Sequence, residues 1–247
     1  MQLRSLAHHL LDFCYPGTCA VCRDPCEGDV PLCENCRIKL ATLELSPACE
    51  QCAMPLKEPD APCAYCQNDG VPHFEKILRL GVFEDPLKHL IHQMKYHRSW
   101  QLAEFLADRL LDQESVKALL TETQVIVSVP LFFTRQLLRG YNQAELIARH
   151  LSRRCRIKFV NALTRVRPTQ TQTNLSATQR IENLRGAFGL IDARHIKDKH
   201  VVLIDDVMTT GATLQSAARA LQTAKPATLC AITVAISDPR GRGFEQI

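Results

Sequence analysis

The sequence contains no apolar run of roughly 18 residues, so it offers no candidate for a membrane-spanning helix. Its first residues lack the long apolar core and small-residue cleavage site of a secretory signal, and we expect a cytoplasmic protein. Aromatic residues make up only 6% of the chain, which argues against binding of single-stranded nucleic acid mainly by base stacking. The formal net charge of +4 gives weak support for a polyanionic partner. The 247 residues suffice for one full α/β domain and a small additional unit.

Cysteine, by contrast, is abundant for a protein expected in a reducing compartment, since the chain has 12. Eight of these residues form four Cys-x-x-Cys pairs, namely Cys19/Cys22, Cys33/Cys36, Cys49/Cys52 and Cys63/Cys66. The second set of two pairs repeats the first with an offset of 30 positions, and Pro25 recurs as Pro55 at the same offset. The N-terminal region is therefore an internal duplication of a four-thiol frame.

Tetrahedral zinc explains this spacing, because one Cys-x-x-Cys turn places two thiolates beside an ion and a second turn completes the coordination at about 2.3 Å. A segment this short has too few apolar residues for a core, and metal binding would supply its folding energy. We expect two structural Zn²⁺ sites of four cysteines each, with an interleaved pairing as the alternative. Disulfides or a redox pair fit a reducing compartment and a repeated frame less well. Cys14 and Cys26 have no counterpart in the repeat and are excluded as ligands, while Cys155 and Cys230 are interpreted as core thiols.

From Ile77 onward the hydrophobic pattern alternates between strand and helix. We expect strands at 77–83, 125–130, 157–160, 200–204 and 227–236, and helices at 85–97, 100–113, 142–154 and 211–224. This alternation predicts an α/β fold with a mostly parallel sheet and helices on both faces. Turn residues after the last cysteine pair place a domain boundary near 67–75. We therefore divide the chain into a zinc-ribbon domain, 1–70, and an α/β domain, 71–247.

Two adjacent acids, Asp205 and Asp206, come directly after the apolar residues of the strand expected at 200–204. Ligands of parallel α/β sheets bind beyond the carboxyl ends of the strands, where we expect these acids. Residues 209–213 then open a helix, and the N–H groups of a helix start, with three threonine hydroxyls, form a cradle for a phosphate. Gly211 allows the backbone to approach the anion closely. We expect the carboxylates to accept hydrogen bonds from ribose-like hydroxyls, and Mg²⁺ on the same ligand to offset their charge.

The pattern of an apolar strand, two acids, two further residues and Thr-Thr-Gly-x-Thr is similar to the binding motif of the type I phosphoribosyltransferases, which hold phosphoribosyl pyrophosphate. The resemblance implies that the acids hold the ribose diol and that the 5′-phosphate is held by Thr209, Thr210, Gly211, Ala212 and Thr213. Residues 128–151 resemble the family's pyrophosphate loop and its adjoining helix, with Arg139 and Asn142 as candidate donors. Residues 163–188 resemble the flexible hood of amidophosphoribosyltransferase-like members, in which Arg165, Arg167 and Arg180 are further candidates.

The order of motifs along this chain resembles that of the ComF family of competence proteins, which includes the GntX proteins. These motifs are the four cysteine pairs, followed by RGYNQ, TQTQTNLS, NLRGAF and IDDVMTTGAT. The chain resembles this family over nearly its whole length. The resemblance implies a type I phosphoribosyltransferase fold preceded by a double zinc ribbon. It also implies a competence factor that binds phosphoribosyl pyrophosphate and acts in DNA uptake or in the use of DNA as a nutrient, with proteins of the uptake machinery as candidate partners.

Two alternative functions stay open. One is an active phosphoribosyltransferase whose acceptor the sequence does not identify. Purine-type relatives often carry an acid that acts as a base where this chain has Thr209. The other is a scaffold that binds single-stranded DNA, for which residues 135–158 are the candidate surface because they hold seven Lys or Arg and one acid, Glu145.

Overall fold

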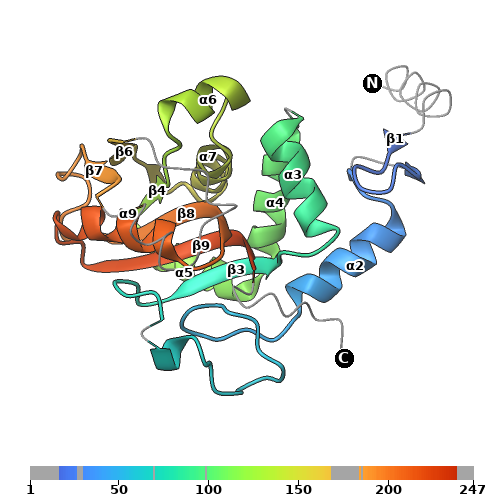
Figure 1. The fold of residues 1–247 in the computed structure, drawn as a ribbon, viewed down its shortest axis with the longest axis horizontal. Helices are drawn as coiled ribbons and strands as arrows, with labels where there is room; N and C mark the ends of the chain where they lie inside the picture. Colours follow the sequence, from blue (N-terminus) through green and yellow to red (C-terminus); the bar gives the residue numbers. More distant parts are fainter. Residues whose placement is uncertain are drawn as a thin grey trace.

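The computed structural model describes residues 17–26, 30–68, 70–97, 99–167, 184 and 186–237. A five-stranded sheet with the order β3-β9-β8-β4-β5 lies at the centre of the fold (Figure 1). Its strands are Ile77–Val82 (β3), Val125–Ser128 (β4), Lys158–Phe159 (β5), His200–Met208 (β8) and Thr228–Ile236 (β9). Every neighbouring pair in this sheet is parallel, so the predicted sheet type is confirmed.

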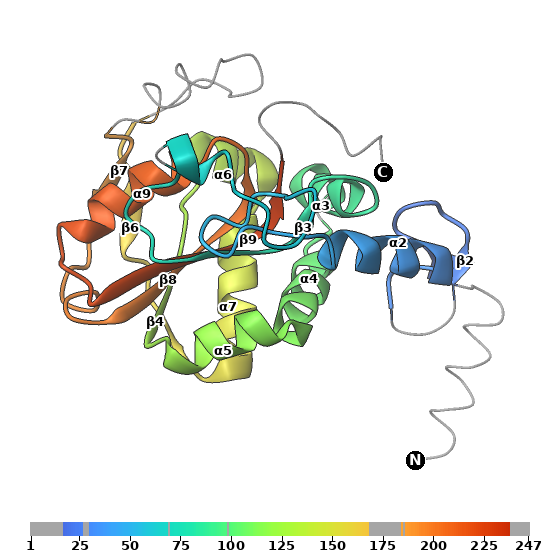
Figure 2. The ribbon, with the colours of Figure 1, turned by 90° about the horizontal axis from the view of Figure 1, so that it is seen from below.

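Helices cover both faces of the sheet (Figure 2). One face shares a buried cluster with Leu87–Tyr96 (α3), Gln101–Asp112 (α4), Glu114–Glu122 (α5) and Gln143–Cys155 (α7). The other face packs against Ala212–Gln222 (α9) and a hairpin of Leu163–Arg165 (β6) with Phe188–Leu190 (β7). Helix α3 packs on the sheet because it is amphipathic. Its buried stripe consists of Leu87, Leu90, Ile91 and Met94, which the helical spacing places on one side. No helix within the described ranges is long and apolar enough to cross a membrane.

Several elements differ from the expectation. Helix α5 and the short helix Phe133–Arg139 (α6) were not expected from the sequence. Strand β8 also runs on to Met208, because its last residues still pair with β9, Val207 with Ala235 and Met208 with Ile236. The two acids therefore lie inside the last part of the strand and not after its end.

The cysteine repeat is also a repeat of backbone structure. We call residues 18–36 the first ribbon and residues 48–66 the second ribbon. Gly17–Thr18 (β1) pairs with Pro25–Cys26 (β2), and the pairing of Thr18 with Pro25 recurs as a bridge between Ala48 and Pro55. The first ribbon leads into helix Glu34–Glu44 (α2), whereas the second ends in a single turn, Cys66–Asn68 (η1). The duplication thus preserves the turns that carry the cysteines, while the helical segment at the end of each copy differs in length.

The two ribbons pack at edge strand β3, but on different faces of the sheet. The first ribbon and α2 join the cluster of α3 and α4 through Cys19, Leu32, Cys36 and Leu40. The second joins the cluster of α9 through Cys52, Ala53 and Met54. Between them, the buried Arg79 of β3 donates hydrogen bonds to Ser46 and to the carbonyl of Pro47. Each ribbon is therefore built into a different half of the core.

Candidate functional site

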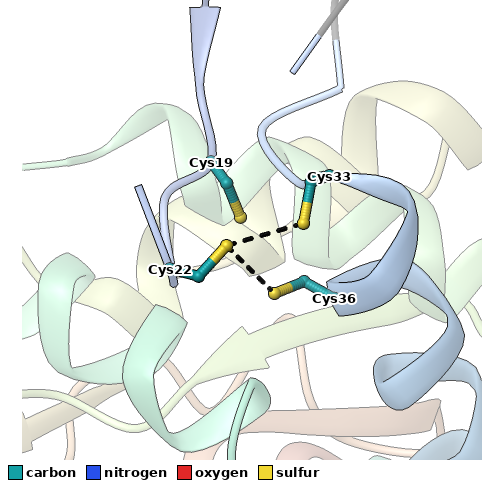
Figure 3. A group of neighbouring side chains, drawn as sticks. All are labelled: Cys19, Cys22, Cys33 and Cys36. Atoms are coloured by element: carbon teal, nitrogen blue, oxygen red, sulfur yellow. Dashed lines mark hydrogen bonds between the residues drawn. The ribbon is translucent and has the colours of Figure 1, made fainter. Parts of the chain in front are cut away.

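In each ribbon the four sulfur atoms converge on one point and lie within 4.8 Å of one another. Figure 3 shows this arrangement in the first ribbon. Adjacent Sγ–Sγ distances are 3.5 Å for Cys22–Cys33, 3.8 Å for Cys22–Cys36, 3.7 Å for Cys49–Cys66 and 3.6 Å for Cys52–Cys63. Sulfurs arranged tetrahedrally at ~2.3 Å from zinc lie ~3.8 Å apart, whereas a disulfide bond measures ~2.05 Å. Both sets therefore fit structural zinc, and the predicted grouping of four and four, without interleaving, is confirmed.

Two of the ribbon thiols lie in surroundings that make zinc binding sensitive to pH. Burial raises the pKa of the Cys36 thiol and of the Cys66 thiol to about 11. Zinc binds thiolates, so these groups release protons when they become ligands and zinc affinity falls on acidification. Cys26 is absent from both clusters, as expected, and its Sγ lies 4.0 Å from the carbonyl of Val30. Cys14 falls outside the described residues.

The adjacent acids of β8 point to opposite faces of the sheet, because side chains alternate along a strand. Asp206 shares a face with Val202 and Ile204, which pack on the α3 side, and its Oδ1 accepts a hydrogen bond from Lys95 Nζ at 2.9 Å. Asp205 is buried on the other side and accepts the N–H of Asp206 at 2.8 Å. Burial and then the charge of Asp206 raise the pKa of Asp205, while the charges of Lys95 and Arg165 oppose the rise.

Lys95 was missed in the sequence, although it supplies the positive charge that two neighbouring acids need. It lies on the last turn of α3, directly after the core residue Met94, and 111 positions from Asp206. Locally it is only a lysine beside a buried helix residue, and that pattern is common on any amphipathic helix.

A pocket at the carboxyl end of β8 is lined by Asp205 and by residues 207–214, which include all five residues predicted to hold a phosphate. Gly211 is the residue before α9 and has a φ of +64°, the left-handed conformation that favours glycine. Gly211 has no side chain that could cap the start of α9, and the first N–H groups of a helix have no acceptor within the helix itself. This is the arrangement that binds phosphate at a helix N-terminus.

The pyrophosphate-loop candidates lie beside α3, outside the lining of this pocket. Arg139 ends α6, with its guanidinium 5.2 Å from the centre of the Tyr96 ring and 3.4 Å from Gln143 Oε1. Asn142 caps α7: its Oδ1 accepts the N–H of Ala144 at 3.2 Å, and its Nδ2 donates to the carbonyl of Val129 at 2.9 Å. The Asn142 amide is thus hydrogen-bonded within the loop, whereas the Arg139 guanidinium lies against the Tyr96 ring of α3.

Tyr141 anchors the same loop to α3, because its hydroxyl donates to the carbonyl of Met94 at 2.6 Å. The last turn of α3 therefore contacts the pyrophosphate loop through Met94 and Tyr96 and the acid of β8 through Lys95. Among the hood arginines, Arg165 lies over the Phe188 ring at 5.4 Å and Arg167 is exposed. Arg180 lies outside the described residues.

The basic stretch at 135–158 is less positive in space than in sequence. Arg149 pairs with Glu145 at 2.8 Å on the same helix. Two further arginines reach acids of α4, Arg153 to Glu104 at 3.4 Å and Arg154 to Asp108 at 3.7 Å. Such exposed pairs contribute little to stability, yet they reduce the positive potential that α7 offers to a polyanion.

This combination of fold and sites defines a phosphoribosyl transferase domain joined to a double zinc ribbon. Family models agree: the phosphoribosyl transferase domain matches residues 137–246 and the double zinc ribbon domain matches residues 10–67. The chain is 36% identical to the DNA utilization protein YhgH of Escherichia coli K12, over 83% of this chain and 91% of that protein. It is 34% identical to competence protein F of Haemophilus influenzae, over 77% and 84% respectively. The chain therefore belongs to the ComF family.

Proposed function

We propose that this protein binds phosphoribosyl pyrophosphate at the carboxyl end of β8 and acts in the utilization or uptake of DNA. The observation that carries the binding proposal is the pocket lined by Asp205 and residues 207–214, which includes the first residues of α9. A 5′-phosphate there would accept N–H groups of the loop that we call the phosphate loop, residues 209–213. The biological part rests on the names of the relatives, DNA utilization protein and competence protein F.

The two acids serve the same part of the ligand in this proposal, although only Asp206 is paired with a lysine. Asp205 faces the pocket and would accept hydrogen bonds from the ribose diol, together with Asp206 when Lys95 moves away from it. Lys95 and Arg139 would then meet the pyrophosphate, because both lie on or against the last turn of α3. Asn142 would shape this loop as a helix cap. Mg²⁺, bound with the diphosphate, would offset negative charge that two cationic side chains leave unbalanced.

Zinc has a structural role in this scheme, since four cysteines complete each tetrahedron and leave no open position for a substrate. We propose a cytoplasmic location and proteins of a DNA-uptake or DNA-processing system as partners.

An active phosphoribosyltransferase with an unidentified acceptor is the second candidate function. The site offers donors for a leaving pyrophosphate, and one well-placed donor typically changes a rate ~10²–10³-fold. Position 209 is threonine, which does not act as a base near neutral pH. A single-stranded-DNA scaffold ranks below both, because acids of α4 and α7 pair with arginines of the candidate surface.

Calorimetric titration of the purified protein separates these functions. Phosphoribosyl pyrophosphate is titrated with and without Mg²⁺, and single-stranded DNA is titrated at two salt concentrations. Saturable binding of phosphoribosyl pyrophosphate that Mg²⁺ strengthens supports the proposed function. A lack of binding refutes the proposed function. DNA binding that weakens steeply with salt, without binding of the diphosphate, would favour the scaffold.

A further inference from the structure

The second ribbon touches the phosphate loop directly. Tyr65 lies between Cys63 and Cys66, and its hydroxyl donates a hydrogen bond to the carbonyl of Thr210 at 2.8 Å. Val71, a little further along the chain, packs against Gly211 so closely that a Cβ at Gly211 would lie 2.6 Å from Val71 Cγ2. The zinc site and the phosphate loop are thus separated by a single side chain.

The first ribbon packs elsewhere. Its counterpart of Tyr65 at the offset of 30 is Asn35, which is exposed. Its own contacts run to the opposite side of the sheet, where Gln93 of α3 donates to the carbonyl of Ala20 and Arg109 of α4 pairs with Glu44. The duplication therefore supplies two zinc sites with the same ligands and different neighbours.

We propose that the second ribbon, through Tyr65, and the adjoining Val71 position the phosphate loop, so that zinc in the second site, and not in the first, sets the affinity for the 5′-phosphate. This inference rests on the proposed binding of phosphoribosyl pyrophosphate. Tyr65 and Val71 act as positioning residues, since they contact the loop from the ribbon side. Each therefore acts on the ligand only through Thr210 and Gly211.

The physical basis is the small core of the ribbon. Loop residues 209–211 connect β8 to α9, and their N–H groups must stay aligned to hold an anion. Tyr65 fixes the carbonyl of Thr210, while the position of Tyr65 is fixed by the flanking ligands Cys63 and Cys66. Because metal binding supplies much of the folding energy of so short a unit, loss of this zinc removes the support of the loop.

Two matched pairs of variants test the proposal. Tyr65→Phe removes only the hydroxyl and is compared with Asn35→Ala in the first ribbon. Cys63→Ser is compared with Cys33→Ser, which removes the equivalent ligand of the other zinc. Each protein is measured for zinc per chain, for calorimetric affinity toward phosphoribosyl pyrophosphate and pyrophosphate alone, and for hydrogen exchange of peptides covering 209–213.

Tyr65→Phe should bind phosphoribosyl pyrophosphate roughly twofold to tenfold more weakly, as expected for one hydrogen bond, with pyrophosphate affinity unchanged. Asn35→Ala should leave both affinities at the wild-type value. Each cysteine variant should lose one zinc, but only Cys63→Ser should accelerate exchange at 209–213. A merely structural role of Tyr65 would weaken both ligands alike and would overturn the positioning role.

Equal exchange at 209–213 in Cys63→Ser and wild type, or equal acceleration in both cysteine variants, would also overturn the proposal. If Cys63→Ser does not fold, Tyr65→Phe decides through the same exchange measurement. Failure of the wild type to bind phosphoribosyl pyrophosphate would refute the proposed function alone, since the exchange comparison requires no ligand.

Discussion

Asp205→Asn tests whether the buried acid at the end of β8 serves a ligand at the expense of stability. Burial, together with the smaller effect of the Asp206 charge, raises the pKa of Asp205 from 3.8 to about 7. One pKa unit corresponds to about 1.36 kcal/mol, so ionising this carboxyl in the folded protein costs on the order of 4 kcal/mol, a cost shared with Asp206. Asparagine keeps the oxygen that accepts the N–H of Asp206 and removes the charge.

The direction of the pKa change sets the sign of the pH dependence. A carboxyl with a higher pKa in the folded than in the unfolded chain stabilises the fold fully below the unfolded pKa of 3.8, and this contribution is lost as the pH rises through about 7. Asp205→Asn should therefore gain stability relative to wild type as the pH rises. Between about pH 5.5 and about pH 8, the difference in unfolding free energy should grow by about 2 kcal/mol.

Urea unfolding at several pH values measures this difference, and its change with pH does not depend on how well asparagine packs. A difference that is constant across the range would refute the reasoning about a desolvated acid. Asp206→Asn is the matched control, because it neutralises the neighbouring acid and leaves Asp205 in place. It leaves the half-buried Lys95 without its partner and should lower stability. The double variant should bind phosphoribosyl pyrophosphate at least ~100-fold more weakly, because charge-assisted hydrogen bonds contribute ~1.5–3 kcal/mol each.

The zinc sites, Arg139 and Gly211 each give a further prediction. Elemental analysis should find two zinc ions per chain. Cys26→Ser should leave this number unchanged, and Cys33→Ser should reduce it to one. A metal-free wild type would refute zinc binding by the two ribbons. Arg139→Ala should weaken phosphoribosyl pyrophosphate far more than ribose 5-phosphate in calorimetry, and equal weakening would assign Arg139 to loop shape. Gly211→Ala should lower unfolding free energy by about 2 kcal/mol or more in urea, through its φ of +64° and the clash with Val71, and Val71→Ala should restore part of it.

Most of the fold was predictable because its signals are local. The buried stripe of α3 and the apolar runs of the strands repeat at their own periods within a few residues. The end of β8 was set too early for the same reason. Asp205 and Asp206 interrupt the apolar run, while the pairing that extends the strand to Met208 is made with β9, distant in sequence. Local polarity therefore placed the end of β8 too early.

The grouping of the eight cysteines into two sets of four was predictable, because tetrahedral zinc coordination imposes a regular spacing on the sequence. The partners of the acid and of the phosphate loop were not. Lys95 and Tyr65 lie 111 and 145 positions from the residues that they contact, and each looks locally like an ordinary helix or ribbon residue. Contacts of this kind depend on which faces of the sheet the preceding elements cover, and only the complete topology determines that.

The duplication itself separates what the metal requires from what the site uses. The turn that carries the first two ligands repeats in detail: the N–H of Cys19 donates to the carbonyl of Asp24, and the N–H of Cys49 donates to that of Met54. Arg23 and Ala53 both adopt a positive φ. Between the last two ligands the copies diverge, to an exposed Asn35 and to a Tyr65 bound to the phosphate loop. Because tetrahedral coordination fixes the cysteines and leaves this position free, a contact with the ligand site could arise in one ribbon without disturbing the metal frame of either.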